Sequence, residues 1–256
     1  MSQVSTQLEG STAILSLGGR TDLNLLGLEL FQSLNDALDE VAADANIKTI
    51  ILRGAGEQAF SAGVDLREAR ELTAPAAEEF IRTLHQTIRK VLSLRMPVIA
   101  VISGPCLGGA LELILACDIK IASEDATFGL PEVLVGIPSV IEASLLPKTI
   151  GLGRARRLIM TGDTVTSREA LDMGLVDQVV QKDEVIAAAL EATEKFRNIS
   201  PKVMAAQKDI FVKWLDMGDE KSAEYSIKIF AEGFATGHPQ EAMTAFLEKR
   251  EPKFNS

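Results

Sequence analysis

The chain has 256 residues, of which 46% are hydrophobic and 24% are charged, a composition typical of a well-packed globular protein. Acidic residues outnumber basic ones by 36 to 26, and the net charge of −10 argues against nucleic acid as the main partner. The sequence contains no apolar stretch long enough to cross a bilayer, so we expect no membrane partner.

Two cysteines, Cys106 and Cys117, favour a reducing compartment without a disulfide framework. The first residues, Met1–Ser5, lack the basic and apolar regions of a secretory signal. We therefore expect a cytoplasmic protein. The two histidines, His85 and His238, have no pattern of cysteines or carboxylates around them that indicates a metal, so we expect no metal site.

Strand and helix patterns alternate through the first half of the chain. Short apolar runs predict strands at Thr12–Leu17, Thr49–Leu52 and Val98–Ile102, with a candidate strand before them at Val4–Leu8. Apolar residues at helical spacing predict helices around residues 30–41, 80–92 and 111–116. Residues 118–122 and 127–128 fit a short hairpin that turns at Glu124-Asp125. This mixture predicts an α/β fold.

The pattern becomes helical after Val180. From Glu184 to Arg250 nearly every residue fits a helix, with breaks at Ser200-Pro201, Met217-Gly218-Asp219 and Gly237-His238-Pro239. This change predicts an α/β core at residues 1–195, which holds the active site, and a helical region at residues 196–256.

Two glycine-bearing stretches carry most of the functional information. They are Phe60-Ser61-Ala62-Gly63-Val64-Asp65-Leu66 and Gly104-Pro105-Cys106-Leu107-Gly108-Gly109-Ala110-Leu111-Glu112. Each follows a predicted strand and leads into a helical pattern, which places free backbone N–H groups at the start of a helix. Two such groups directed at one point form an oxyanion hole, which indicates an enzyme that stabilises an enolate. The alternative is that the glycines only serve the strand-to-helix turns.

Two glutamates accompany these stretches. Glu112 lies in the first turn of a very apolar helix, where burial would be costly for its charge and a raised pKa would suit acid–base chemistry. Its alternative role is that of a first-turn carboxylate stabilised by the helix dipole. Glu132 follows Pro131 and taken alone fits an ordinary turn glutamate.

The segment from Phe60 to Glu132 resembles the crotonase superfamily of enoyl-CoA hydratases and isomerases. Its F-S/C-A-G-x-D-L loop, G-G-x-x-E helix start and F-G-x-P-E turn occur in order and at matching spacing at residues 60–66, 108–112 and 128–132. Similarity continues from about Ser11 to residues 245–254. The resemblance implies a crotonase (ClpP-like) fold, a spiral of ββα units followed by a helical C-terminal region that serves trimerisation and covers an active site.

The resemblance also implies roles for individual residues. The backbone N–H groups of Val64 and Gly109 match the two oxyanion donors, Glu112 matches the residue that polarises the attacking water, and Glu132 matches the residue that exchanges the proton at the α-carbon. The expected substrate and coenzyme A contacts are Ala62, Gly63, Asp65, Leu66, Arg67, Gly108 and Lys249. Coenzyme A enters as part of an acyl-CoA thioester substrate, so no separate cofactor is expected. For Arg67 the alternative is a solvated charge on the helix surface.

Both glutamates together favour hydration of a 2-enoyl-CoA, because isomerases of this superfamily generally keep only the second. The alternatives are a Δ3–Δ2 enoyl-CoA isomerase, another enolate-forming acyl-CoA enzyme of the superfamily, and a catalytically silent acyl-CoA-binding or RNA-associated scaffold. The sequence departs from hydratases at residues 136–142, where the usual glycine-rich run is missing. Glu142 in that segment is either an extra acid in the site or a surface or helix-start residue. Leu25 stands where relatives carry a small residue, which leaves the acyl group open.

A homotrimer or a dimer of trimers is expected, assembled through the helices after about Phe196. The resemblance implies it, and Met243, Phe246 and Leu247 form an apolar set at helical spacing that needs a partner surface. Packing of this set on the chain's own core is the alternative.

Overall fold

Two sheets organise the computed structural model, which describes residues 2–254. The large sheet has the order β1-β2-β3-β4-β6-β9 and consists of Gln3–Glu9, Thr12–Gly18, Thr49–Gly54, Val98–Ile102, Ile119–Ser123 and Gln178–Val180. Its first pair, β1 and β2, is antiparallel, and every later pair is parallel. The small sheet has the order β5-β7-β8 and consists of Pro105–Leu107, Thr127–Gly129 and Thr164–Thr166. The predicted α/β class is confirmed.

The chain passes repeatedly from the large sheet to the small one, which produces a spiral. Strand β4 is followed within three residues by β5, and β6 is followed in the same way by β7. Strands β5 and β7 pair in parallel with each other. Each of these two turns of the spiral therefore contributes one strand to each sheet.

The hairpin predicted at residues 118–128 is wrong. Strand β6 pairs with β4 and β9 in the large sheet, whereas β7 pairs with β5 and β8 in the small sheet. The polar residues between them mark a step from one sheet to the other rather than a reversal within one ladder. Local sequence cannot distinguish these outcomes, because both need a short polar turn between two apolar runs.

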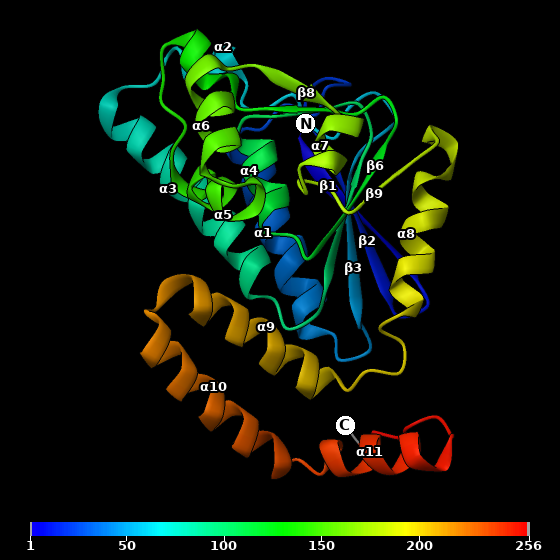
Figure 1. Cartoon of the computed structure of the whole chain (residues 1–256). Coiled ribbons are helices and arrows are strands. Elements are labelled where there is room, and N and C mark those ends of the chain that lie inside the picture. The colour runs from blue at the N-terminus through cyan, green and yellow to red at the C-terminus, as the bar shows by residue number, and fades with distance from the viewer. Residues whose placement is uncertain (1, 255–256) are drawn as a thin grey trace.

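The central strands are buried on both faces, as expected for a parallel sheet covered by helices. Side chains that alternate with period two fill two apolar clusters. The larger cluster includes Leu15, Leu17, Ile50 and Leu52 and packs against α1 (Leu28–Ala43), α3 (Ala74–Ser93) and α4 (Gly109–Leu115). The smaller includes Ile14, Ile51 and Ile99 and packs against α8 (Val185–Glu194). Figure 1 shows α8 on the opposite side of the large sheet from α1, α3 and α4.

Shorter helices connect these layers. They are α2 (Leu66–Ala69), α5 (Leu146–Ile150), α6 (Leu152–Thr161) and α7 (Ser167–Asp172), together with the 3-10 helices η1 (Pro131–Val135), η2 (Ile141–Leu145) and η3 (Lys182–Glu184). Two of them, η1 and η2, lie between strands β7 and β8 in the chain and contribute to the site described below.

Three helices complete the chain: α9 (Pro201–Asp216), α10 (Asp219–Phe234) and α11 (His238–Glu248). They start at the three breaks predicted from the sequence. At the first break, the Ser200 side chain accepts a hydrogen bond from the N–H of Val203 at 3.3 Å, and Pro201 occupies the first helical position. In Figure 1 these helices form an arch below the sheets, in which α9 lies nearest to them.

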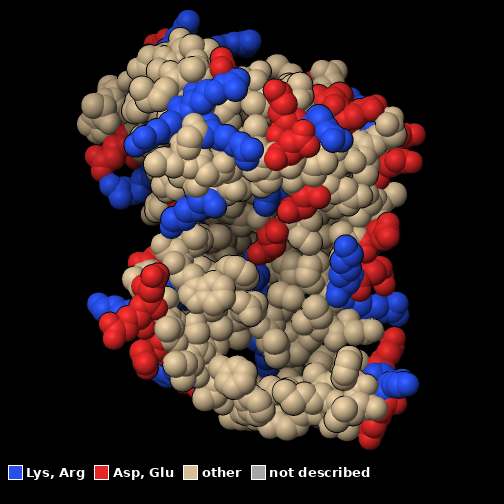
Figure 2. Space-filling view, viewed as in Figure 1, with Lys and Arg blue, Asp and Glu red and all other residues tan. Residues whose placement is uncertain are grey.

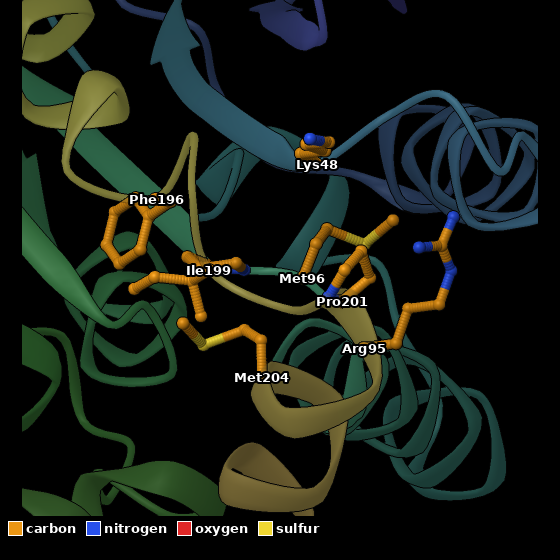
Figure 3. A pocket seen from close by; sticks show the side chains of 8 residues that line it. Lys48, Arg95, Met96, Phe196, Ile199, Pro201 and Met204 are labelled. Carbon is orange, nitrogen blue, oxygen red and sulfur yellow. The ribbon is translucent and has the colours of Figure 1, made fainter. Parts of the chain in front are cut away.

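A small cavity of about 10 Å³ lies where this arch joins the rest of the chain, which is about the space that one water molecule needs. Figure 3 shows apolar side chains around it, among them Met96, Phe196, Ile199 and Met204. The Nζ of Lys48 donates a hydrogen bond to the carbonyl oxygen of Arg197 at 3.2 Å. The joint is therefore closely packed. Within residues 2–254, no helix combines the length and the apolar character needed to cross a bilayer.

Candidate active site

The first glycine stretch passes close to the second. Gly63 has φ +91°, and a Cβ at this residue would lie 2.9 Å from the carbonyl oxygen of Leu107. A larger residue would therefore meet both backbone strain and a steric clash. The side chain of Ser61 fixes the turn by accepting a hydrogen bond from the N–H of Gly63 at 3.1 Å. Asp65 then caps α2 by accepting a hydrogen bond from the N–H of Arg67 at 3.0 Å.

The second glycine stretch begins α4. Gly108 has φ +57°, and its N–H donates to the carbonyl oxygen of Gly129 at 2.9 Å. Gly109 is the first residue of the helix. A Cβ at Gly109 would lie 4.0 Å from Cγ2 of Val64. The two glycine stretches therefore contact each other at Val64 and Gly109, which are 45 positions apart in the sequence.

The N–H groups of Val64 and Gly109 are free for a ligand. Val64 pairs with Leu26 in an isolated parallel bridge, but the bonds of that bridge use the carbonyl of Gly63 and the N–H of Asp65. The N–H of Gly109 is among those that the first turn of a helix leaves unpaired. Within residues 2–254 neither group has a hydrogen-bond acceptor. Two free amides at one cleft are what an oxyanion hole requires.

A cleft of about 410 Å³ contains these two residues. Most of its wall is apolar, and its polar side chains are those of Asp65, Arg67 and Glu132. The residues that line it are Leu25, Ala62, Gly63, Val64, Asp65, Leu66, Arg67, Gly108, Gly109, Pro131, Glu132, Leu134, Val135 and Ile137. An apolar cleft with few polar groups is typical of a small-molecule site.

Glu132 lies in the first turn of η1 and lines the cleft. Its Oε2 accepts a hydrogen bond from the hydroxyl of Ser139 at 2.9 Å. Its Oε1 lies 2.9 Å from the position that a Cβ would take at Gly108. The absence of a side chain at Gly108 therefore allows the carboxylate to approach the turn that carries the Gly109 amide.

Glu112 lies in the first turn of α4 and is only 2% exposed. Its Oε2 accepts a hydrogen bond from the N–H of Ala143 in η2 at 2.9 Å. Burial, together with the charges of Glu132 and Glu142, raises the pKa of Glu112 to about 8, against the lowering effect of the Ala143 amide. The buried carboxyl therefore holds a proton at neutral pH and can exchange it near that range, which suits general acid–base catalysis.

Two residues predicted to contact coenzyme A have different settings. Arg67 is exposed at the cleft and has no ion-pair partner among the described residues. Lys249, which follows the last residue of α11, is exposed and is not among the residues that line the cleft. A single copy of the chain thus brings residues 62–67, Gly108 and Gly109 together with Glu132 at the cleft, whereas Glu112, buried in α4, and Lys249 are not among the residues that line it.

Sequence reasoning assigned no site role to Ser139 or His85 and left Glu142 between an extra acid and a surface or helix-start residue. Ser139 holds Glu132, and Glu142 lies in the first turn of η2 but is buried rather than on the surface. The Nδ1 of His85 lies 2.8 Å from Oε1 of Glu142. In the sequence, the only sign of this contact is that Glu142 stands in an apolar segment. The helices α3 and η2 are too distant in sequence for a local pattern to indicate their contact.

The arrangement offers two free amides for an oxyanion and carboxyl groups nearby for proton exchange, which is the equipment of an enzyme that acts on a carbonyl compound. An enoyl-CoA hydratase structure from Bacillus anthracis matches 98% of this chain and 98% of its own, with a TM-score of 0.92 and 32% identity. The predicted crotonase fold is therefore confirmed.

Similarity to known sequences shows the family to which the chain belongs. The family described as enoyl-CoA hydratase/isomerase matches residues 7–256. The short-chain-enoyl-CoA hydratase of Clostridium acetobutylicum is 32% identical over 98% of this chain and 96% of its own length. A probable enoyl-CoA hydratase of Bacillus subtilis is 35% identical over 99% of both chains. The chain belongs to the enoyl-CoA hydratase/isomerase family.

Proposed function

We propose that this protein is an enoyl-CoA hydratase-like lyase, which adds water reversibly to the double bond of a 2-enoyl-CoA. The observation that carries the proposal is the meeting of two unpaired amides and a carboxylate at one apolar cleft, with a second, proton-bearing carboxyl in the helix that begins there. The relatives of similar length that are named hydratases support it.

The proposed chemistry divides between the amides and the two glutamates. The N–H groups of Val64 and Gly109 donate to the thioester oxygen as it gains enolate charge. As the oxygen of water bonds to the β-carbon, ionised Glu112 accepts a proton from that water. Glu132 delivers a proton to the α-carbon, and the product is a 3-hydroxyacyl thioester. Before the next turnover Glu112 releases the proton it took from water to the solvent, and Glu132 takes one up. Dehydration uses the same groups in the opposite protonation states, with Glu112 as the acid.

The isomerase alternative would use Glu132 alone, because moving a double bond needs a proton shuttle but no attacking water. Replacement of Glu112 separates the two activities. In Glu112→Ala we expect hydration to fall on the order of 10²–10⁴-fold, while any isomerisation survives in part. Hydration is followed as the loss of absorbance of a short enoyl-CoA, and isomerisation is followed with a 3-enoyl-CoA. An equal fall of both activities in a folded variant would contradict this division of roles.

The substrate itself is described only by the chemistry of the cleft. Leu25, Leu134, Val135 and Ile137 provide an apolar wall that favours an aliphatic acyl group. With a net charge of −10, the chain offers no overall attraction to the phosphates of coenzyme A. We therefore propose that local cations hold them: Arg67 from the same chain, and Lys249 from a neighbouring copy.

We also propose a homotrimer or a dimer of trimers, assembled through α9, α10 and α11. A groove of about 500 Å³ between these helices is lined by apolar residues such as Val203, Ile210 and Phe230. Side chains of α11 point away from the chain's own core, with Phe246 83% and Leu247 80% exposed. Figure 2 shows a mostly uncharged surface over these helices, with charged side chains at its margins. Patches of this kind mark interaction surfaces.

Light scattering at micromolar concentration tests the assembly. The expected mass is about three or six times the 27.5 kDa of one chain. The matched pair is Phe246→Ser, which removes an apolar contact, and Lys253→Ser, which removes a charge near the same end. Only the first should shift the mass towards smaller species. A monomer in the unaltered protein would reject the trimer.

We also propose a cytoplasmic location. Cys106 and Cys117 are both free and buried, and burial raises the pKa of Cys117 to about 12. Both therefore act as neutral, unreactive core side chains, as fits a reducing compartment.

A further inference from the structure

Glu142 is a buried carboxylate for which the mechanism above has no use. It lies in the first turn of η2, is 5% exposed, and is not among the residues that line the cleft. One of its oxygens, Oε2, is buried without a hydrogen-bond partner among the described residues. A buried polar atom without a hydrogen-bond partner lowers stability, so its presence needs an explanation.

His85 of α3 is the partner of the other oxygen. Its Nδ1 lies 2.8 Å from Oε1 of Glu142, although the two groups are not aligned as a hydrogen bond. The His85 side chain is 44% exposed, so the contact joins a buried carboxylate to a ring that reaches solvent. Arg89, one helical turn further along α3, is directed to Asp216 of α9 at 2.7 Å. Within the described residues, His85 is the basic side chain that contacts Glu142.

The 3-10 helix η2, which contains Glu142, also forms a hydrogen bond with Glu112 of α4. The N–H of Ala143, which follows Glu142, donates to Oε2 of Glu112. Burial, Glu132 and the charge of Glu142 raise the pKa of Glu112, and the backbone N–H groups of Ala143 and Glu142 lower it. Cys106, on β5 beside α4, is a fully buried thiol whose pKa burial raises, so it contributes no charge. The charged groups that act on Glu112 are therefore Glu132 and Glu142.

The backbone before Glu142 is strained. Ile141 has φ +40°, a conformation that is costly for a β-branched residue. Strain of this kind persists only where surrounding contacts impose it, and it occurs most often at functional sites. Here the contact with α3 and the hydrogen bond to Glu112 lie directly after the strained residue. The turn thus directs its carboxylate towards α3 and its amide towards Glu112.

We propose that Glu142, held by His85, is a positioning residue for the hydration reaction: its turn orients Glu112, and its negative charge opposes a second negative charge there. This role rests on the proposed function above. Glu142 transfers no proton to the substrate. It selects the pH range in which Glu112 can accept a proton from water or return one to a leaving hydroxyl.

The test is the pH profile of kcat/KM for hydration, which reports the ionisation of groups in the free enzyme. Hydration requires ionised Glu112, so the rate of the unaltered protein should rise with pH up to about 8. In Glu142→Gln, which keeps the shape and removes the charge, we expect this rise to move by about one pH unit to lower pH. KM should stay within about threefold.

Asp216→Asn is the matched control, because it breaks the ion pair of α3 with α9 one turn from His85. It should leave the profile unshifted, and Glu142→Asp, which keeps the charge, should retain most of the unaltered profile. If Glu142→Gln does not fold, the variant His85→Gln is tested in its place. In His85→Gln, kcat should fall at least about fivefold while KM stays unchanged. An unshifted profile in folded Glu142→Gln, or an unchanged kcat in His85→Gln, overturns the role of Glu142 alone. Absence of hydration in the unaltered protein overturns both proposals.

Discussion

Glu132→Gln is expected to lose nearly all turnover, on the order of 10²–10⁴-fold in kcat, while its affinity for an acyl-CoA stays within about tenfold. Glutamine keeps the shape of the side chain and can still accept the hydrogen bond that Ser139 donates at 2.9 Å. It cannot deliver a proton to the α-carbon. The loss should therefore appear in kcat, measured by the absorbance of an enoyl-CoA, and not in binding, measured by calorimetry with a non-reactive acyl-CoA.

Glu78→Gln is a suitable control for this substitution. Glu78 lies on α3, where it forms a surface ion pair with Arg82 and has 68% of its side chain exposed. Exposed pairs of this kind contribute little to stability, so this variant should hydrate at the unaltered rate. Equal rates in Glu132→Gln and the unaltered protein would remove Glu132 from the mechanism.

Gly109→Pro is expected to lose about 2.7–4 kcal/mol of transition-state stabilisation, or on the order of 10²–10³ in rate. The substitution deletes the N–H that is free at the cleft. Proline suits the first position of a helix, which Gly109 occupies in α4, and Gly109 is not among the residues with positive φ. The fold should therefore survive, as circular dichroism and the melting temperature would verify.

Gly109→Ala separates the amide from the added carbon. A Cβ at this residue would lie 2.9 Å from Cδ2 of Leu84, the far end of a flexible side chain. Both variants bear that crowding, but only alanine keeps the N–H. The alanine variant should thus retain much more activity than the proline variant. A folded proline variant that hydrates at the unaltered rate would show that the Gly109 amide does not face the thioester oxygen.

Regular elements were predictable from the sequence where a local rule decides them. The strands at Thr49–Gly54 and Val98–Ile102 contain short apolar runs at residues 50–52 and 98–102. The final helices begin directly after Ser200, Gly218 and Gly237, where serine and glycine precede a helical pattern. The false hairpin at β6 and β7 arose because pairing partners are set by the spiral of the whole core and not by the turn between two strands.

The site was predictable to the extent that it uses backbone. A backbone position with positive φ favours glycine, so it can be recognised in the sequence. Gly63 and Gly108 are two such positions, and they lie where the two stretches approach each other. The contact between His85 and Glu142 leaves no such mark, because it depends on how α3 packs against a 3-10 helix more than 50 positions away. The strained φ of Ile141 is equally invisible in a sequence that would favour an extended residue there.

The most direct test of the account is to incubate the protein with a short 2-enoyl-CoA in ¹⁸O-labelled D₂O and to analyse the product by mass spectrometry. Water addition by the proposed groups predicts a 3-hydroxyacyl-CoA that carries one ¹⁸O at the β-carbon and one deuterium at the α-carbon. Recovery of the starting thioester without labelled oxygen, or of a product in which only the double bond has moved, would contradict the proposed hydratase.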